Sequence, residues 1–258
     1  MKYSINADSR FIIKNADEYK CQFNRLGDII DLIELAQARL NIVFDPVDDN
    51  DIKLLHNQIK ILEQKEIDYV VACKNLSTLY TVLIDYKIPA YLDCPISDWE
   101  TFFNLLDWGV IDIWIDGALC FSADAIKKYA EHTYIRMCPH MSANAGFASV
   151  KKSNIQSAFI RPEDVDKYET FIDILDFRTN DIEMEKVLFD IYKRGYFHNN
   201  LKELVKQVHS DINNTLIPKD FAEMRLNCTQ KCRIPFHSCH FCERMLLLTT
   251  TLRQYIKS

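Results

Sequence analysis

The chain has 258 residues, of which 48% are hydrophobic and 12% aromatic, and its formal net charge is −6. This composition supplies enough apolar side chains for a sizeable core and excludes an intrinsically disordered chain. No apolar run approaches the roughly 20 residues that span a bilayer, and the polar start at Met1–Asp8 does not predict a secretory signal. We therefore expect a soluble, cytoplasmic protein.

Short β-rich runs alternate with amphipathic stretches along most of the chain. The predicted strands are Phe11–Lys14, Asn41–Phe44, Asp68–Ala72, Pro89–Leu92, Ile111–Ile115, Thr133–Arg136, Ser157–Ile160 and Ile172–Phe177. They are near-continuous apolar runs more than strict alternations, which is typical of parallel strands buried on both faces. Eight such strands with helices between them predict an α/β fold of the (β/α)8 TIM-like barrel type, and a doubly wound open sheet is the alternative.

Two helix starts can be read directly from the sequence. The segment Ser97-Asp98-Trp99-Glu100 predicts a capping box for a helix that stops at Gly109, and Asn180-Asp181-Ile182-Glu183 predicts a second start. After residue 181 the pattern becomes helical. We therefore divide the chain into a barrel body, residues 1–181, and a C-terminal helical segment, residues 182–258, which packs on the barrel as one domain.

The few glycines exclude some functional classes, and the spacing of the tryptophans indicates their role. With only five glycines, the chain contains neither a P-loop nor the dinucleotide-binding fingerprint, which excludes the commonest nucleotide-dependent functions. The three tryptophans lie at helical or strand spacing, for which core packing is the expected role. They are Trp99, Trp108 and Trp114.

Four of the nine cysteines lie within fifteen residues of one another. They are Cys228, Cys232, Cys239 and Cys242, with the spacing C-x3-C-x6-C-x2-C. Two short cysteine pairs aim four thiolates at one point, which predicts a metal site. Four thiolates suit both zinc and a [4Fe–4S] cluster, and His237 or His240 can replace a cysteine. The closed ligand shell favours a structural role that holds the last helix.

Charge is distributed unevenly between the body and the tail. From Arg225 to Ser258 there are six Lys or Arg and one acid, so this tail carries +5 and residues 1–224 carry −11. A chain with this overall negative charge is not expected to bind nucleic acids in general. Its basic tail can nevertheless contact RNA or a protein partner. The simpler interpretation is that these charges solubilise a terminal helix.

The chain contains the segment Ile160-Arg161-Pro162-Glu163-Asp164-Val165, followed by Ile172–Arg178. These two segments resemble peptidase family U-32, the collagenase-like family. The family has an (I/L)(K/R)PEDL strand-turn-helix and then a strand ending in Gly-Arg, for which Arg178 is the counterpart here, without the glycine. The segments Asn199–Leu204 and Cys239–Glu243 also resemble C-terminal parts of relatives, so that the resemblance covers about residues 90–245.

This resemblance implies a TIM-like barrel, often with an iron–sulfur cluster, in proteins classed as peptidases, and some relatives act in RNA or quinone hydroxylation. In those proteins the cluster cysteines are spread along the chain, whereas here they lie together near its end. A weaker analogy links the chain to queuine transglycosylase barrels, which place a cysteine-rich zinc site late in the sequence and use aspartates at the ends of barrel strands.

In a (β/α)8 barrel the active site lies at the C-terminal ends of the strands. The charged and polar residues at the predicted ends are Asp45, Lys74, Asp93, Asp116, His140, Arg161 and Arg178, with Glu163 close by. The aspartates can act as nucleophile or general base, the histidine as a proton shuttle, and the arginines as binders of carboxylate or phosphate. Helix capping and solvated loop charges are the structural alternatives.

Two functions remain open from the sequence. The first is a U-32-like barrel enzyme, a peptidase or a hydroxylase-type enzyme, with a metal site and a peptide, a nucleic-acid base or a small anionic molecule as its substrate. The second is a non-catalytic barrel scaffold whose metal-stapled basic tail docks on a protein or RNA. Convergence of the strand-end residues in one pocket favours the enzyme.

Overall fold

The computed structural model describes residues 1–7, 15–96, 98–115, 123–139, 160, 162–179 and 181–195. Within these residues every strand is short and most strands are followed by a helix or a helical turn. No helix in this part of the chain is long and apolar enough to cross a membrane.

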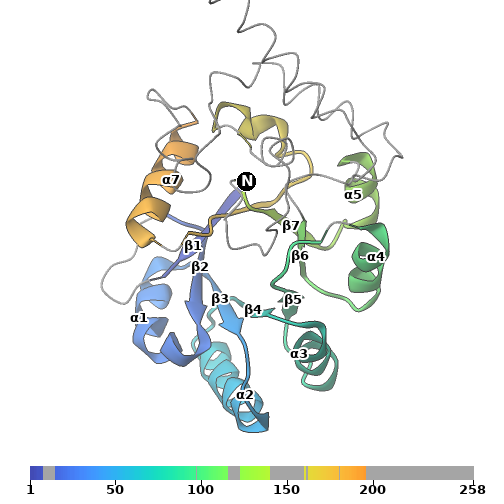
Figure 1. Cartoon of the computed structure of the whole chain (residues 1–258). Helices are drawn as coiled ribbons and strands as arrows, with labels where there is room; N and C mark the ends of the chain where they lie inside the picture. Colours follow the sequence, from blue (N-terminus) through green and yellow to red (C-terminus); the bar gives the residue numbers. More distant parts are fainter. Residues whose placement is uncertain are drawn as a thin grey trace, which may run out of the picture.

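Eight parallel strands form the centre of the molecule, and helices surround them (Figure 1). The strands are β1 Lys2–Asn6, β2 Glu18–Gln22, β3 Arg39–Phe44, β4 Tyr69–Cys73, β5 Ala90–Leu92, β6 Asp112–Ile115, β7 Tyr134–Met137 and β8 Ile174–Asp176. The helical elements are η1 Phe23–Arg25, α1 Leu26–Ala36, α2 Asp49–Gln64, α3 Leu76–Tyr80, η2 Thr81–Asp85, α4 Trp99–Asp107, α5 Ala123–Tyr129, η3 Pro162–Lys167 and α7 Ile182–Arg194.

The sheet closes on itself. Its strand order is β5-β4-β3-β2-β1-β8-β7-β6, so β5 and β6 are the two ends of the sheet. Four residues beyond the end of β5, Ile96 forms a parallel bridge with Ile115 of β6, and its N–H donates to the carbonyl of Trp114 at 2.9 Å. The arrangement is therefore a nearly closed (β/α)8 TIM-like barrel, as predicted, and not the open sheet.

Six of the eight observed strands, β3 to β8, overlap predicted ones, but β1 and β2 were not predicted. The predicted strand Phe11–Lys14 lies outside the described residues, and so does Ser157–Ile160 except for Ile160, which is not in a strand. Both missed strands alternate in character. In β2, Tyr19 and Cys21 join the core under the helices, whereas Glu18 and Lys20 belong to a buried ionic network.

Aspartate caps position three of the surrounding helices. Asp98 opens α4 by accepting a hydrogen bond from the Thr101 N–H at 2.8 Å, so the cap is Asp98 and not Ser97. Asp181 opens α7 as predicted and accepts from the Glu183 N–H. The left-handed Gly195 ends α7, at a φ of 71°. Asp48 caps α2 in the same way.

Helix α7 packs across the outside of β1 and β8. Phe189 meets Tyr3 edge-on at 5.7 Å between ring centroids, and Tyr192 meets Phe177 at 5.3 Å. The carboxylate of Glu185, also on α7, is fully buried and accepts hydrogen bonds from the backbone N–H and side-chain amide of Asn6. This helix therefore fixes the C-terminal end of β1, where the mouth of the barrel begins.

Candidate functional site at the mouth of the barrel

Three of the predicted strand-end residues meet at the C-terminal mouth of the barrel. The Lys74 ammonium, directly after β4, donates to Asp93 Oδ2 at 2.6 Å, and the Arg178 guanidinium, two residues after β8, pairs with Asp93 Oδ1. The Asp93 side chain is 1% exposed, but that of Arg178 is 17% and that of Lys74 42% exposed. A buried carboxylate thus bridges two cations that solvent can reach.

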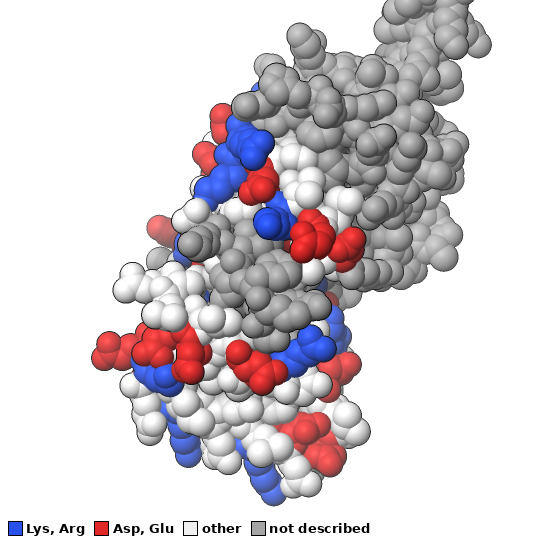
Figure 2. Space-filling view, turned by 90° about the vertical axis from the view of Figure 1, so that its left-hand side faces the viewer, with Lys and Arg blue, Asp and Glu red and all other residues white. Residues whose placement is uncertain are grey.

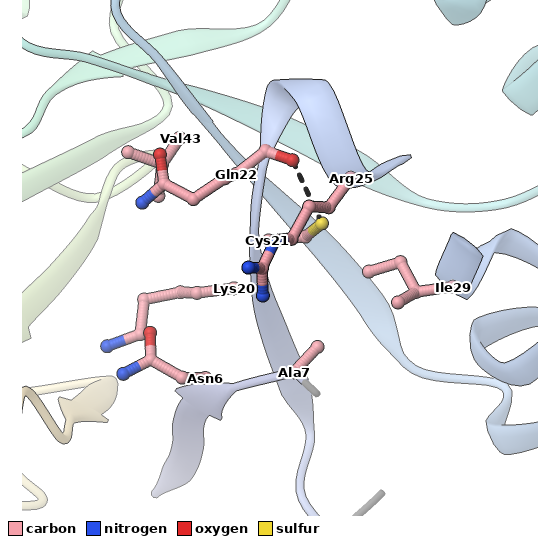
Figure 3. Close-up of a pocket in the computed structure, with 8 residues that line it drawn as sticks. All are labelled: Asn6, Ala7, Lys20, Cys21, Gln22, Arg25, Ile29 and Val43. Carbon is pink, nitrogen blue, oxygen red and sulfur yellow. Dashed lines mark hydrogen bonds between the residues drawn. The ribbon is translucent and has the colours of Figure 1, made fainter. Parts of the chain in front are cut away.

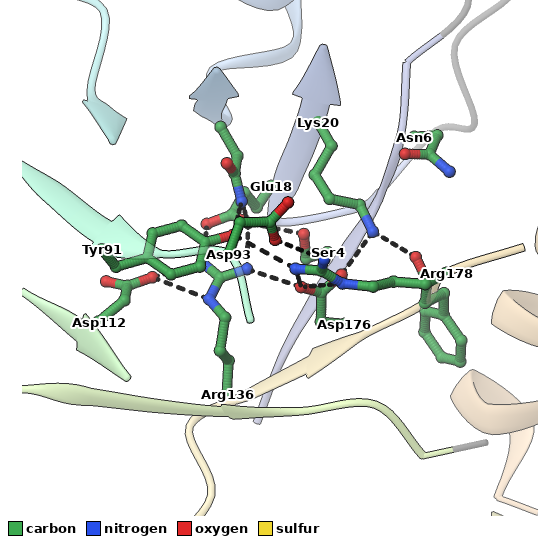
Figure 4. A network of polar contacts seen from close by, with 12 residues as sticks. Ser4, Asn6, Glu18, Lys20, Tyr91, Asp93, Asp112, Arg136, Asp176 and Arg178 are labelled. Carbon is green, nitrogen blue, oxygen red and sulfur yellow. Dashed lines mark hydrogen bonds and ion pairs between the residues drawn. The ribbon is translucent and has the colours of Figure 1, made fainter. Parts of the chain in front are cut away.

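Arg178 is held in one orientation by its neighbours (Figure 4). Its Nε and Nη2 donate to Asp176 Oδ2 at 3.0 and 2.6 Å, and Nη2 lies 3.4 Å from the Tyr91 hydroxyl oxygen, which accepts. The guanidinium carbon lies 3.6 Å from the centroid of the Trp114 ring, a cation–π contact. Trp114 therefore supports the site in addition to packing, half-buried, against the core, which is the role predicted for it.

Below the mouth, Arg136 is the centre of a fully buried ionic network (Figure 4). Its two terminal nitrogens each donate to one oxygen of Glu18 at 3.0 Å, and Nη1 also donates to Asp176 at 3.0 Å. It further donates to Asp112, and its guanidinium carbon lies 4.3 Å from the Tyr91 ring centroid. A single arginine thus connects strands β2, β6, β7 and β8 through the barrel interior.

The remaining interior charges are also paired. Arg39 forms a two-pronged contact with Asp112, at 2.8 and 3.1 Å. The Lys20 ammonium donates to Asp176 and to the carbonyl of Phe177. Three carboxylates, Glu18, Asp112 and Asp176, therefore face three cations, Lys20, Arg39 and Arg136, in the deep part of the network.

The charges in this network keep the carboxyl groups ionised. Burial alone raises the pKa of Asp93, but attraction to Arg178 and Lys74 outweighs burial and holds this pKa below its usual value. The same balance, with Arg136 and Arg39 as the cations, lowers the pKa of Glu18. Asp93 is therefore a carboxylate near neutral pH and a weak proton acceptor.

A pocket of about 220 Å³ lies beside this site, at the ends of β1, β2 and β3 (Figure 3). Its lining combines cationic, amide and apolar side chains, namely Asn6, Ala7, Lys20, Cys21, Gln22, Arg25, Ile29 and Val43. Burial raises the pKa of the Cys21 thiol to about 12, so this thiol is protonated near neutral pH. Lys20 belongs to both the pocket and the ionic network.

The other predicted site residues are placed differently. Asp45 directly follows β3, is exposed, and forms no ion pair with the described residues. Glu163 lies exposed in η3. The remaining predicted residues lie outside the described residues, and they are Asp116, His140, Arg161 and the cysteines Cys228, Cys232, Cys239 and Cys242.

No family model matches the chain, and no curated protein matches it. Among solved structures, one described as the structure of the U32 peptidase Mk0906 matches with a TM-score of 0.45 and 11% sequence identity. The match covers 70% of this chain and 94% of the other. The chain thus has a distant structural resemblance to a U32 peptidase.

Sequence reasoning missed the residues that support the site from inside the barrel. Glu18, Lys20 and Arg136 lie within strands and not after them, so a reading of strand ends does not reach them. Asp176, the last residue of β8, was passed over in favour of Arg178. The available signal was period-2 alternation of charged and apolar residues, as in Glu18-Tyr19-Lys20-Cys21, which places every second side chain inside the barrel.

Proposed function

We propose that this protein is a barrel enzyme that acts on a small anionic substrate at the C-terminal mouth, where Arg178 and Lys74 bind the anionic group. The observation that carries the proposal is the bridge of Asp93 between these two partly exposed cations. The Asp93 carboxylate contacts both cations, and a substrate carboxylate or phosphate would bind to the same two cations beside it. Arginine and lysine are the side chains that proteins use for such groups.

The charge count of the network supports an anion at this place. The deep part contains three anions and three cations, and the mouth adds two cations, Arg178 and Lys74, but only one further anion, Asp93; Arg178 also pairs with Asp176 of the deep part. The ion-paired cluster of described residues therefore carries one positive charge in excess, five cations less four anions. This excess lies at the part of the cluster that solvent reaches, so an incoming anion meets the unbalanced charge first.

Each residue has a separate part in this proposal. Asp176 and Trp114 hold the guanidinium of Arg178, so that binding an anion costs little reorganisation. Lys74 is the more exposed cation and can move from Asp93 to the substrate. Since Asp93 is a weak base, we assign proton transfer to the strand-end residues Asp116 and His140, of which the histidine titrates nearest neutral pH.

We also propose that the four-cysteine cluster holds zinc or a [4Fe–4S] cluster in a structural role. Four thiolates in the spacing of Cys228, Cys232, Cys239 and Cys242 form a closed ligand shell, which leaves no position open for a substrate. The metal site is thus separate from the proposed chemistry at the barrel mouth.

The proposed anion site is tested by titrating the protein with inorganic phosphate and with acetate at constant ionic strength. Binding is followed by tryptophan fluorescence, because Trp114 contacts Arg178. Arg178→Gln should raise Kd by about ten-fold or more, since it removes a charged hydrogen-bond donor. Lys60→Gln, an exposed change on α2 with the same loss of charge, is the matched control and should leave Kd unchanged.

Turnover is tested by incubating wild-type protein and Arg178→Gln with the same mixture of small carboxylates and phosphates and following the mixture by NMR. A compound consumed by the wild type but not by the variant supports the enzyme. Absence of anion binding in the wild type, or equal binding in both proteins, refutes the anion site.

A second candidate function is docking of the basic tail on an acidic protein or RNA. The observation that favours it is the +5 charge from Arg225 to Ser258 on an otherwise acidic chain. On the face shown in Figure 2, by contrast, the exposed charges of both signs are interspersed among the described residues. Changing Lys231, Arg233 and Arg244 to glutamate should abolish partner binding without changing the circular dichroism spectrum, and retained binding excludes this function.

A further inference from the structure

The pocket beside the mouth has a positive lining. It contains two cations, Lys20 and Arg25, and two side-chain amides, Asn6 and Gln22, of which the Asn6 amide already donates to Glu185; no carboxylate is among the described lining residues themselves. The Cys21 thiol adds no negative charge near neutral pH, because burial raises its pKa to about 12. The chemistry of this lining favours an anionic group with hydrogen-bond acceptors.

Arg25 is the cation available to such a group. The charge of Lys20 is already paired with Asp176. Arg25, on η1, is exposed and takes part in no ion pair with the described residues. Figure 3 shows its guanidinium turned back toward the cavity, near Cys21. An anion in the pocket would therefore gain a new ionic contact with Arg25 without breaking an existing one.

The pocket and the proposed anion site at Arg178 are neighbours through shared residues. Lys20 lines the pocket and donates to Asp176, and the same carboxylate accepts two hydrogen bonds from Arg178. A molecule that occupies the pocket thus lies next to the residues that hold the mouth arginine. A single ligand that binds at both places would have to pass Lys20.

We infer that the substrate is a dianion with two anionic groups joined by a short carbon chain, one group bound by Arg178 and Lys74 and the other by Arg25 in the pocket. This inference rests on the proposed anion site. The pocket volume of about 220 Å³ equals that of roughly seven water molecules, which fits one anionic group and a few methylenes. Ile29, Val43 and Ala7 supply apolar contacts for those methylenes.

The test compares acetate with succinate, glutarate and adipate, and adds 3-phosphonopropionate to distinguish a second phosphate-like group from a second carboxylate. Binding is measured by tryptophan fluorescence at constant ionic strength, with calorimetry as a second readout. One of the longer ligands should bind wild-type protein more tightly than acetate. Arg25→Gln should raise the Kd of that ligand by about two- to five-fold, the range for an exposed charged contact, and leave the Kd of acetate unchanged.

Two further variants separate the possible results. Arg178→Gln should raise the Kd of acetate and of the dianions alike, and Lys60→Gln should change neither Kd. If acetate binding depends on Arg178 but the dianions bind no more tightly and ignore Arg25→Gln, the inference is wrong and the anion site remains. If acetate and phosphate do not bind the wild type at all, the proposed function fails, and the inference fails with it.

Ala7→Phe provides an independent check, because it fills the pocket without changing any charge. This variant should reduce dianion binding to the level of acetate. Unchanged dianion binding in a folded Ala7→Phe protein would show that the second group binds elsewhere, and it would overturn the inference.

Discussion

Replacing Arg136 by methionine removes a fully buried positive charge and keeps an unbranched side chain in its place. In the wild type this guanidinium donates to Glu18, Asp112 and Asp176 and lies over the Tyr91 ring. The variant leaves these carboxylates short of one partner in the barrel interior. Breaking a buried ionic contact in this way costs about 3–5 kcal/mol, a large share of the roughly 5–15 kcal/mol by which domains are stable.

The loss of stability should depend on pH. In the wild type the cations hold the pKa of Glu18 and of Asp176 below their usual values, so these carboxylates stabilise the fold fully above their unfolded pKa of about 4. This contribution is lost as the pH falls through the folded pKa. In Arg136→Met burial still acts on Glu18, but its largest attraction is gone, so its pKa rises, whereas Asp176 keeps its attraction to Arg178 and Lys20 and changes less.

As the pH falls, the buried carboxyl groups of the variant are therefore protonated before those of the wild type. Protonation removes their uncompensated charge and so recovers part of the lost stability. We expect the free-energy difference between the proteins to be largest near about pH 7.5 and smaller near about pH 5. Urea unfolding followed by circular dichroism at both pH values measures it, with the exposed Lys60→Met as the control. A difference below about 1 kcal/mol, or the same difference at both pH values, would refute the view that Arg136 neutralises these carboxylates.

Three further results are expected. Trp114→Leu removes the ring under Arg178 and should raise the Kd for phosphate by about three- to ten-fold in calorimetry, and an unchanged Kd would contradict the supporting role. Asp98→Ala removes the cap that accepts from the Thr101 N–H and hydroxyl and should cost about 1 kcal/mol in urea unfolding, whereas no loss would mean that the cap is replaced. Anaerobically purified protein should contain about one zinc or about four irons per chain, and Cys239→Ser should lose them; metal retained in full would exclude this ligand.

The barrel could be predicted because six of its strands carry enough apolar residues to stand out from the helices between them. Strands β4 and β5 are continuous apolar runs, and aspartates such as Asp181 mark the starts of helices. β1 and β2 escaped because their inward residues, Ser4, Glu18 and Lys20, are polar. A search for apolar runs assumes that the barrel interior is apolar, whereas several strands of this barrel point charged side chains into it.

The residues at the mouth of the barrel could be predicted only in part. Lys74, Asp93 and Arg178 directly follow or lie close after strands, so chain position alone indicates a common edge. Their pairing depends on which strands are neighbours across the closed barrel, and residues 74, 93 and 178 come from three different strands. Asp45 shows the limit of the rule, since it also follows a strand and is exposed without an ion pair to the described residues.

The ionic interior itself supports a function at the mouth. Buried charges are costly, and well-packed apolar side chains in the place of Glu18 and Arg136 would often give equal or greater stability. What apolar residues cannot do is add to the attraction on Asp176, whose pKa is held below its usual value first by Arg178 and then by Lys20 and Arg136. Lys20 and Arg136 thus help to keep Asp176 charged, and Asp176 fixes the guanidinium of Arg178. The network therefore places one arginine at the solvent-reachable end of the barrel with its orientation already set, which is what binding an anion there requires.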